Sequence, residues 1–279
     1  MRLLSFAITV AVGVATGSFC DEADFALIWS DEFDGDAVNA STWTVAAHGP
    51  GRSDTRDAAA IASAVAVANG ALVITTNGTW DASTAAWTNL TSGAVQSKGK
   101  RSFEAGGVPL RVCISAKLPG GGAAGAGRGV WPALWLMPDT SACWPCAGEI
   151  DILEMINGDG LCRGTYHWNK SNKSGDNQQS GRSTPMPAGW GDAWHEFGVE
   201  YDGATAIKFA LDGKVYDTVT KWTWSSHLQR ARFFDVPYYF ILNTAVGGGW
   251  PEPPDAGTVM PTQHYVDYVR VARKKSAAT

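Results

Sequence analysis

The segment Gly148–Met155 places three carboxylates inside an otherwise apolar run, and this pattern constrains the fold more than any other part of the chain. Successive side chains of a β-strand point to opposite faces, so Glu149 and Asp151 would share one face while the isoleucines share the other. Glu154 breaks this alternation, because strict pairing would bury its charge beside the isoleucines, which is costly without a partner. A β-bulge at Ile152–Leu153 would return Glu154 to the carboxylate face. The segment therefore predicts a bulged strand with three acids on one face.

Three interpretations of these carboxylates compete. A buried structural charge cluster would need basic partners, and this stretch contains none. A calcium site would use oxygen ligands, but it usually requires loop carbonyls and turn glycines as well. We favour paired carboxylates for sugar chemistry. The bulged segment advances about 13 Å between the two glutamates. Side chains that lean toward each other can reduce the carboxyl separation to about 5–5.5 Å, the value for a retaining glycosidase.

Length and composition agree with a carbohydrate partner. The 279 residues allow one large domain with a sizeable core, or two small ones. The net charge of −5 and the scattered basic residues argue against nucleic acid or an anionic membrane as the main partner. The 13 Trp, 10 Phe and 7 Tyr must mostly pack the core, but their flat rings can also stack on the faces of sugars.

The first 17 residues are typical of a secretory signal peptide. Arg2 precedes an apolar run over residues 3–14 that is too short to span a bilayer, and small residues follow at plausible cleavage positions. Five Asn-X-Ser/Thr sequons agree with export, at Asn39, Asn77, Asn89, Asn169 and Asn172. Because no apolar tail closes the chain, we expect no membrane anchor. We expect a secreted, extracellular protein in which residues 18–279 form a single domain.

The cysteine count indicates disulfides and at least one unpaired thiol. Five cysteines are odd in number, so at least one should stay free or pair with another chain. Cys143 and Cys146 have C-x-x-C spacing, but no second such pair and no helical context supports a redox or zinc motif. We favour a local structural disulfide between them, or separate bridges to Cys113 and Cys162; the connectivity stays open.

From Phe25 onward the chain consists of short β-type runs separated by Gly, Pro, Asn and Asp. The predicted strands are 25–29, 71–75, 110–117, 130–137, 148–155, 163–168, 194–201, 206–211, 214–219, 238–246 and 265–272. Asp212-Gly213 predicts a tight hairpin turn, and the alanine-rich residues 57–68 are ambiguous. The pattern predicts an all-β fold, most simply a two-sheet antiparallel β-sandwich of the jelly-roll type.

Several other features call for an interpretation. Gly120–Gly129 lacks the helix and the Gly-Lys-Ser/Thr of a phosphate loop, so it predicts a surface loop. Trp131 and Trp135 fall on one strand face shortly before the acidic strand and could line a cleft with it. We expect His195 to be a structural strand residue. For His167, which follows the carboxylates, a role in the site and a structural role stay equally open. The remaining histidines show no metal-ligand spacing.

The sequence resembles glycoside hydrolase family 16, the β-glucanases and laminarinases. Gly148–Glu154 is similar to the bulged E-x-D-x-x-E signature of this family, and Gly129–Trp135 is similar to the run that precedes it. Further similar segments follow in family order, at 29–35, 92–93, 97–100, 242–248 and 266–271. The resemblance covers residues 25–272, and the bulged signature resembles the laminarinase branch more than the lichenase or xyloglucan-transferring branches.

The resemblance implies a retaining endo-β-glucanase with an open carbohydrate-binding cleft. By position, Glu149 would be the nucleophile, Glu154 the general acid/base, and Asp151 the assisting carboxylate between them. The expected sugar-binding residues are Trp131, Trp135, His167, Arg111 and Trp250. No cofactor is expected for catalysis. The family often carries a structural calcium ion, and the residues matching that site are Glu32, Gly70 through its carbonyl, and Asp267.

Two departures from the family bear on substrate preference. Pro109-Leu110-Arg111 stands where the family commonly shows Tyr-Gly-Arg, and Asp57–Ala60 replaces polar and aromatic residues that commonly shape the sugar-binding subsites. We expect a monomer that hydrolyses internal β-1,3 bonds of laminarin-like glucans, or of mixed β-1,3/1,4 glucans. The alternatives are a transglycosylase with the same machinery, a galactan-cleaving enzyme, and a β-glucan-recognition protein without turnover. Relatives of that last kind typically lose the catalytic glutamates, which are present here.

Overall fold

The computed structural model describes residues 17–122, 124–169, 171, 173–201, 206–220 and 236–276. Within these ranges the helices are three single turns of 3-10 helix, η1 (Phe19–Asp21), η2 (Ala62–Ala64) and η3 (Trp190–Asp192). None of the helices in this part of the chain is long and apolar enough to cross a membrane. Residues 1–16 of the predicted signal peptide and the sequon at Asn172 lie outside the described residues.

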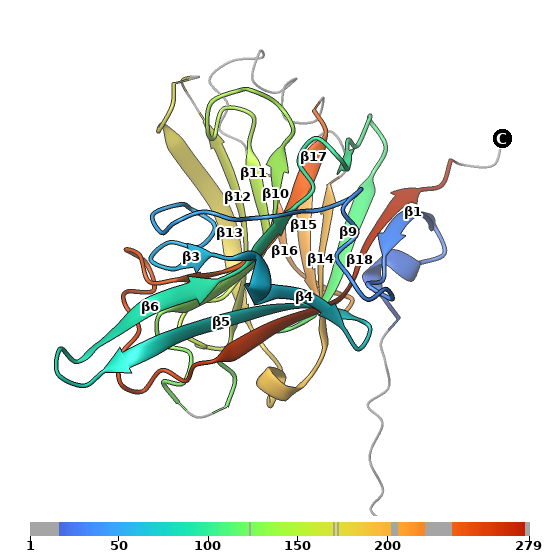
Figure 1. The fold of residues 1–279 in the computed structure, drawn as a ribbon. Helices are drawn as coiled ribbons and strands as arrows, with labels where there is room; N and C mark the ends of the chain where they lie inside the picture. Colours follow the sequence, from blue (N-terminus) through green and yellow to red (C-terminus); the bar gives the residue numbers. More distant parts are fainter. Residues whose placement is uncertain are drawn as a thin grey trace, which may run out of the picture.

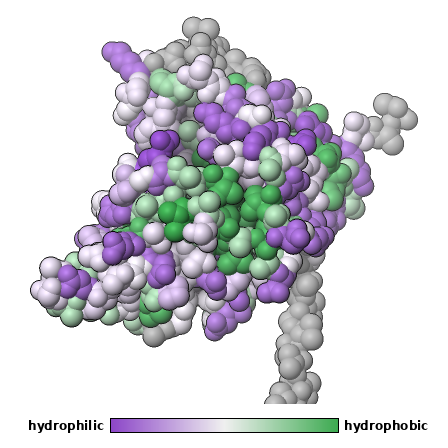
Figure 2. Space-filling model, viewed as in Figure 1, coloured by the Kyte–Doolittle hydropathy of each residue, from purple (hydrophilic) through white to green (hydrophobic). Residues whose placement is uncertain are grey.

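The larger of the two sheets has ten strands in the order β16-β15-β14-β9-β18-β5-β6-β3, with β1 paired to β18 and β4 paired to β5. Its strands are β1 (Phe25–Asp31), β3 (Ala59–Ala60), β4 (Val65–Ala68), β5 (Ala71–Asp81), β6 (Ala86–Ser92), β9 (Leu110–Lys117), β14 (His195–Tyr201), β15 (Ile207–Leu211), β16 (Lys214–Val219) and β18 (Thr262–Lys274). The β5–β6 hairpin extends away from the body of the molecule (Figure 1). Hydrophobic side chains gather on the face over β3, η2 and β4 (Figure 2), which come from the alanine-rich segment.

The second sheet has eight strands in the order β13-β12-β11-β10-β17-β7-β2, with β8 paired to β17. Its strands are β2 (Thr44–Val45), β7 (Ala94–Gln96), β8 (Ser102–Phe103), β10 (Val130–Pro138), β11 (Glu149–Glu154), β12 (Leu161–Asn169), β13 (Asn177–Pro185) and β17 (Tyr238–Val246). Figure 1 shows β10 to β13 side by side, with the acidic strand β11 between β10 and β12. The predicted two-sheet β-sandwich is therefore confirmed.

One apolar core joins the two sheets. Ile114 and Val269 from the ten-stranded sheet belong to the same buried cluster as Leu134, Ile152 and Phe240 from the eight-stranded sheet. Each of these side chains is almost completely removed from solvent. Burial of one such side chain stabilises the fold by about 1.5–3 kcal/mol, so this core holds the sheets, and with them the acidic strand, in a fixed relation.

Every strand predicted from the sequence is present, and three of them, β9, β16 and β17, have the predicted bounds. The sequence did not predict β2, β6, β7, β8 or β13, and β3 and β4 lie in the alanine-rich segment that it left ambiguous. The edge strand β13 is mostly polar and exposed, so it lacks the apolar alternation that marks a half-buried strand. The predicted hairpin turn joins β15 to β16, and Asp212 and Gly213 both have positive φ, as a type I′ turn requires.

The glycine-rich segment Gly120–Gly129 is only partly the surface loop that was predicted. Ala126 is buried, and a Cβ added at Gly121 would lie 2.1 Å from the Cα of Gly191. A Cβ at Gly127 would lie 2.8 Å from the backbone nitrogen of Gly158. These close approaches between backbones explain why the segment is rich in glycine.

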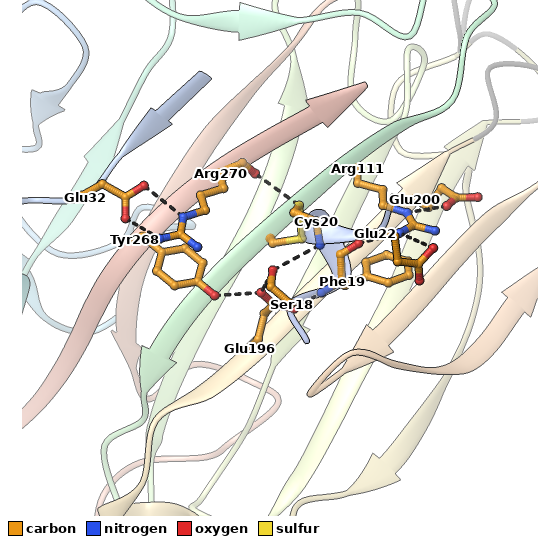
Figure 3. Close-up of a disulfide and its surroundings, with 11 residues drawn as sticks. Ser18, Phe19, Cys20, Glu22, Glu32, Arg111, Glu196, Glu200, Tyr268 and Arg270 are labelled. Carbon is orange, nitrogen blue, oxygen red and sulfur yellow. Dashed lines mark hydrogen bonds and ion pairs between the residues drawn. A yellow bond between two sulfur atoms is a disulfide. The ribbon is translucent and has the colours of Figure 1, made fainter. Parts of the chain in front are cut away.

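The N-terminal segment Ser18–Glu22 is fastened across the outer face of the ten-stranded sheet, and we call this arrangement the N-terminal clamp. A disulfide joins Cys20 to Cys113 on β9 (Figure 3). Glu196 on β14 accepts hydrogen bonds from the Ser18 hydroxyl and from the backbone N–H of Phe19. The local Cys143–Cys146 disulfide, one of the two alternatives from the sequence, is present, and Cys162 is a buried free thiol.

Arg111 belongs to the N-terminal clamp and not to a sugar-binding site. Its neighbours along β9, Leu110 and Val112, point into the core between the sheets, so Arg111 points to the opposite face. There its Nε lies 2.6 Å from a Glu200 carboxylate oxygen, and its Nη1 lies 2.9 Å from a Glu22 oxygen (Figure 3). The prediction that Arg111 contacts substrate is therefore wrong.

The residues predicted for a structural calcium ion do not fit that ion. Both carboxylate oxygens of Glu32 accept hydrogen bonds from Arg270, at 2.9 and 2.8 Å (Figure 3). These bonds hold the pKa of Glu32 below its usual value. The Arg270 guanidinium thus takes both Glu32 oxygens that a calcium ion would need. Only the Gly70 carbonyl and Asp267 then remain of the three predicted ligands.

Candidate active site

The predicted bulge lies at the predicted place on β11. On one side Asp151 pairs with Thr165 and Glu154 pairs with Arg163, so three steps along β11 match two steps along β12. On the other side the register with β10 shifts between Leu134 and Trp135. The bulge leaves Ile152 and Leu153 both fully buried and turns Glu154 to the same face as Glu149 and Asp151.

The three carboxylates line one cleft, with a volume of about 880 Å³, on the eight-stranded sheet. Four of the five expected sugar-binding residues line the same cleft: Trp131, Trp135, His167 and Trp250. His195, by contrast, lies on β14 in the other sheet, where its Nδ1 is 2.8 Å from an Asp212 carboxylate oxygen. This position agrees with the structural role expected for His195.

Glu149 and Asp151 lie against an indole and an imidazole. The Nε1–H of Trp144 donates a hydrogen bond of 2.8 Å to Glu149 Oε2. His167 is the cross-strand neighbour of Glu149, and its Nε2 lies 3.1 Å from Asp151 Oδ2 and 3.8 Å from Glu149 Oε1. The Nδ1 of the same imidazole lies 3.0 Å from the side-chain oxygen of Asn177, which fixes the ring. Of the two roles left open for His167, the structure therefore favours contact with the carboxylates.

Glu154 is bordered by a different set of groups. The Nε1–H of Trp131 donates a hydrogen bond of 3.1 Å to Glu154 Oε1, and Arg163 lies across from Glu154 on β12. Trp250 packs edge-on against Trp131 with the ring centroids 5.1 Å apart. The indole of Trp135, the cross-strand neighbour of Asp151, points its N–H away from the acids and donates 2.7 Å to Asn243.

Electrostatics set these acids apart from ordinary surface carboxylates. Burial raises the pKa of each of Glu149, Asp151 and Glu154 to about 8. For the two glutamates, the nearby charge of Asp151 raises the pKa further, while His167 and one indole N–H each act in the opposite direction. A cluster of this kind keeps protons at neutral pH, so one member can act as an acid while another is ionised.

Ligand atoms of Glu149, Asp151 and His167 lie within 4.8 Å of one another, which is close enough to hold a metal ion. An ion bound there would occupy the carboxylate oxygens that face the cleft.

Two carboxyl groups on one face, each with an indole donor and a third carboxyl group between them, have the composition needed for nucleophilic attack and proton transfer at a sugar acetal.

The sequence interpretation missed several residues of this cleft. Trp144 stands in the C-x-x-C segment directly before the acidic strand, where the sequence signal is the cysteine spacing and not the tryptophan. Asn243 lies on β17, and its place depends on the pairing of β17 with β10, which no local pattern reveals. Arg56 and Arg163 also line the cleft, and neither belongs to a recognisable motif.

Comparison with known proteins gives consistent matches. The family model described as "XgeA-like, catalytic GH16 domain" matches residues 54–190. The chain is 33% identical to a beta-glucanase of Rhodothermus marinus, over 98% of this chain and 95% of that protein. It is 31% identical to glucan endo-1,3-beta-glucosidase A1 of Niallia circulans, over 89% of this chain but only 38% of that longer protein.

A solved structure shares the fold. The endo-beta-1,3-glucanase from Pyrococcus furiosus superimposes with a TM-score of 0.73 at 31% sequence identity. The match covers 91% of this chain and 96% of the other. The similarity therefore extends over both sheets and includes the strand that carries the three acids.

Proposed function

The chain belongs to glycoside hydrolase family 16, and on this premise we propose that it is a secreted, retaining endo-β-glucanase that hydrolyses internal β-1,3 bonds of laminarin-like glucans. The observation that carries the proposal is the bulge on β11. It directs Glu149 and Glu154 into one cleft, gives each an indole hydrogen-bond donor, and places Asp151 between them.

In the proposed reaction Glu149 is the nucleophile and Glu154 the general acid. Glu149 attacks the anomeric carbon while Glu154, kept protonated by burial, donates its proton to the leaving oxygen. The Trp144 N–H and the His167 imidazole favour the ionised form of Glu149, which attack requires. Asp151 lies beside the nucleophile as the assisting carboxylate.

The second half of the reaction reverses the role of Glu154. The negative charges of Glu149 and Glu154 repel each other. Once Glu149 is esterified it carries no charge, so this repulsion disappears and ionisation of Glu154 becomes easier. Ionised Glu154 can then take a proton from the incoming water, which attacks the glycosyl ester. Two displacements at the same carbon retain the anomeric configuration. In this scheme the nucleophile and the acid/base are both side chains of the protein.

The aromatic residues of the cleft support binding of a neutral sugar chain. Trp131, Trp135 and Trp250 line the cleft with the acids, and the Trp250 side chain remains 45% exposed, so its ring is available to a ligand. Support for β-1,3 linkages comes from the similarity to the glucan endo-1,3-beta-glucosidase of Niallia circulans and the endo-beta-1,3-glucanase of Pyrococcus furiosus. Mixed β-1,3/1,4 glucans remain within the proposal, since "beta-glucanase" names the Rhodothermus relative.

Secretion is supported by two observations. The Cys20–Cys113 and Cys143–Cys146 disulfides suit an oxidising compartment. The sequon asparagines Asn39, Asn77 and Asn89 are exposed, whereas Asn169 is buried and its side-chain amide donates to a backbone carbonyl. We therefore expect glycans at the three exposed sites when the protein passes through a eukaryotic secretory pathway.

The test is incubation of the purified protein with laminarin, barley β-glucan and agarose, with the products resolved by size and their first-formed anomer identified by NMR. We expect short β-glucan oligosaccharides from laminarin that carry the β-configuration before mutarotation. First-formed α-products would overturn retention. Products longer than the starting oligosaccharide would indicate transglycosylation instead, and binding without any products would indicate a recognition protein.

A further inference from the structure

One wall of the cleft, on the Glu154 side, consists of alternating aromatic rings and guanidinium groups. Arg56 lies over the ring of Trp131, 5.1 Å from its centroid, and Trp131 packs edge-on against Trp250. Arg163 lies over Trp250, 5.5 Å from that centroid. All four side chains line the cleft. Two cations thus border the two rings on which a sugar can stack.

The arginines around this wall differ in whether a carboxylate lies close enough to pair with them. Arg163 pairs with Asp159, Arg128 pairs with Glu252, and Arg182 lies 3.6 Å from an Asp217 oxygen. Among the residues that the structure describes, no carboxylate lies within ion-pair distance of Arg56, and its Nε is buried without a hydrogen-bond acceptor.

The two acids nearest to Arg56 in the sequence are already engaged. Asp54 lies 3.0 Å from Nε2 of His48, and Asp57 accepts a hydrogen bond from the backbone N–H of Gly248. The positive charge of Arg56 is also not among the groups that shift the pKa values of the catalytic carboxyl groups. The arginine that acts on the pKa of Glu154 is Arg163. Within the described part of the chain, Arg56 is therefore a cation of the cleft whose charge no carboxylate balances.

The backbone holds Arg56 in this place at a cost. Its φ is +54°, a left-handed conformation that is uncommon for residues other than glycine, asparagine and aspartate. The backbone N–H of Arg56 donates to Arg52, its carbonyl accepts from Gly51, and its side-chain stem runs along Gly248. Strained backbone of this kind concentrates at functional sites. Packing against Trp131 alone would not require a charged residue.

We propose that Arg56 binds an anionic substituent of the sugar chain, so that the cleft prefers β-glucans that carry carboxylate or sulfate groups to the neutral polymer. This inference rests on the proposed function, since it specifies the substrate class of the same cleft. A guanidinium presents a planar set of N–H donors that matches the oxygens of a carboxylate or sulfate group in a two-point contact. The guanidinium lies over the Trp131 ring, and the sugar ring that carries the anion would stack beside it.

The experiment measures binding without turnover. In a Glu149→Gln background, calorimetry compares three laminarin oligosaccharide preparations of one length, which are unmodified, carboxymethylated and sulfated. We expect the anionic probes to bind roughly tenfold more tightly than the neutral one, because hydrogen bonds between charged partners are the stronger kind. Arg56→Gln should remove most of this preference. Arg52→Gln, an exposed arginine of the same loop outside the cleft, should leave it intact.

Equal affinity for neutral and anionic probes would overturn the inference. So would an equal loss on all three probes in Arg56→Gln, since Arg56 would then serve only to support Trp131. A preference for only one of the two anions would support the inference and identify the substituent. If Arg56→Gln does not fold, the test is the affinity of the protein that retains Arg56, measured at rising sodium chloride concentrations. The preference for anionic over neutral probes must then shrink as the salt concentration rises. Failure of the wild type to cleave laminarin would refute the glucanase proposal while leaving these binding results valid.

Discussion

Glu149 and Glu200 are both buried carboxylates of one β-sandwich, but the two sheets surround them with different groups. In the ten-stranded sheet, Glu200 lies against Lys208 and Arg111, each with a nitrogen 2.6 Å from one of its oxygens. Burial pushes the pKa of Glu200 upward, but these two cations outweigh that effect and the pKa is lowered. In the cleft, Glu149 meets an indole, an imidazole and a second acid, and its pKa rises to about 8.

The difference shows how one fold separates stability from chemistry. A buried acid with matched cations remains ionised and contributes to stability as long as both partners are present. A buried acid that is given only neutral donors and another acid retains a proton, and this makes it useful for proton transfer but costly to the fold. Substitutions in both sheets test this contrast, from the largest expected effect to the smallest.

Removal of a cleft carboxylate should abolish activity and spare the fold. We expect Glu149→Gln and Glu154→Gln each to reduce kcat on laminarin by orders of magnitude, since general acid catalysis alone contributes about 10²–10⁴-fold. The matched control is Glu252→Gln, an exposed glutamate near the same cleft that pairs with Arg128. Near-normal turnover in either of the first two variants would refute the assigned roles.

Removal of the N-terminal clamp should have the reverse effect. The Cys20–Cys113 disulfide closes a loop with a sequence separation of 93. Replacement of both cysteines by serine should lower the free energy of unfolding by about 4 kcal/mol, with kcat unchanged below the melting temperature. Chemical denaturation and laminarin assays on the same samples measure both quantities.

The Cys143–Cys146 pair is the control for the clamp. Its sequence separation is 3, so the entropic stabilisation is smaller, but the loop it closes carries Trp144. Serine at both positions should therefore affect activity more than stability. A loss of kcat in the Cys20–Cys113 variant at full folding would contradict the separation of roles.

The two buried glutamates should give the stability opposite dependences on pH. The pKa of Glu149 is about 8 in the folded protein and near 4.5 when unfolded, so its burial destabilises the fold increasingly as the pH rises from 4.5 to 8. Glu149→Gln removes this cost and should be more stable than wild type at pH 8, by about 4 kcal/mol, with no difference near pH 4.

Glu200 has a lowered pKa, so its contribution is present at neutral pH and lost as the pH falls through the folded-state pKa. Glu200→Gln leaves Arg111 without its buried partner and should destabilise the protein at pH 7 by about 3 kcal/mol, and by less at acidic pH. Denaturation midpoints measured across the pH range test both variants. Parallel curves for the two would contradict the contrast between the sheets.

Trp144→Phe should produce the smallest effect, a displaced pH profile. The Trp144 N–H lowers the pKa of Glu149, so its loss raises that pKa further, and the ionised nucleophile forms only at higher pH. We expect the acidic limb of kcat/KM to move upward by roughly half a pH unit to one unit, which corresponds to one lost hydrogen bond. Trp194→Phe, an exposed tryptophan of the other face of the molecule, is the control. An unshifted limb in Trp144→Phe would show that this contact does not act on the nucleophile.

Local patterns predicted the elements and the acidic strand. Alternation of apolar and polar residues located the strands, and the misplaced charge of Glu154 required the bulge that β11 contains. Such features can be read from the sequence because they depend on neighbours one to three residues away. The polar edge strand β13 escaped detection because only one of its faces packs against the protein.

The surroundings of the acids could not be predicted in the same way. Arg111 stands in a run that resembles a sugar-binding motif. However, its side chain points to the outer face of β9, where it contacts the segment Ser18–Glu22 and forms part of the N-terminal clamp. Glu32 resembles a calcium ligand, yet Arg270 reaches it from β18. In both cases a partner distant in the sequence decides the outcome: Glu200 lies 89 positions from Arg111, and Arg270 lies 238 positions from Glu32.

From residue order alone, the alternation of side chains along a strand and the cost of a buried charge predicted three carboxylates on one face of a bulged strand. Which of the buried acids meet cations and which do not depends on how the strands pack in three dimensions. Charge pairing acts through space across strands that are distant in sequence, so Glu200 became a structural ion, while Glu149 and Glu154 keep the raised pKa values on which the proposed reaction depends.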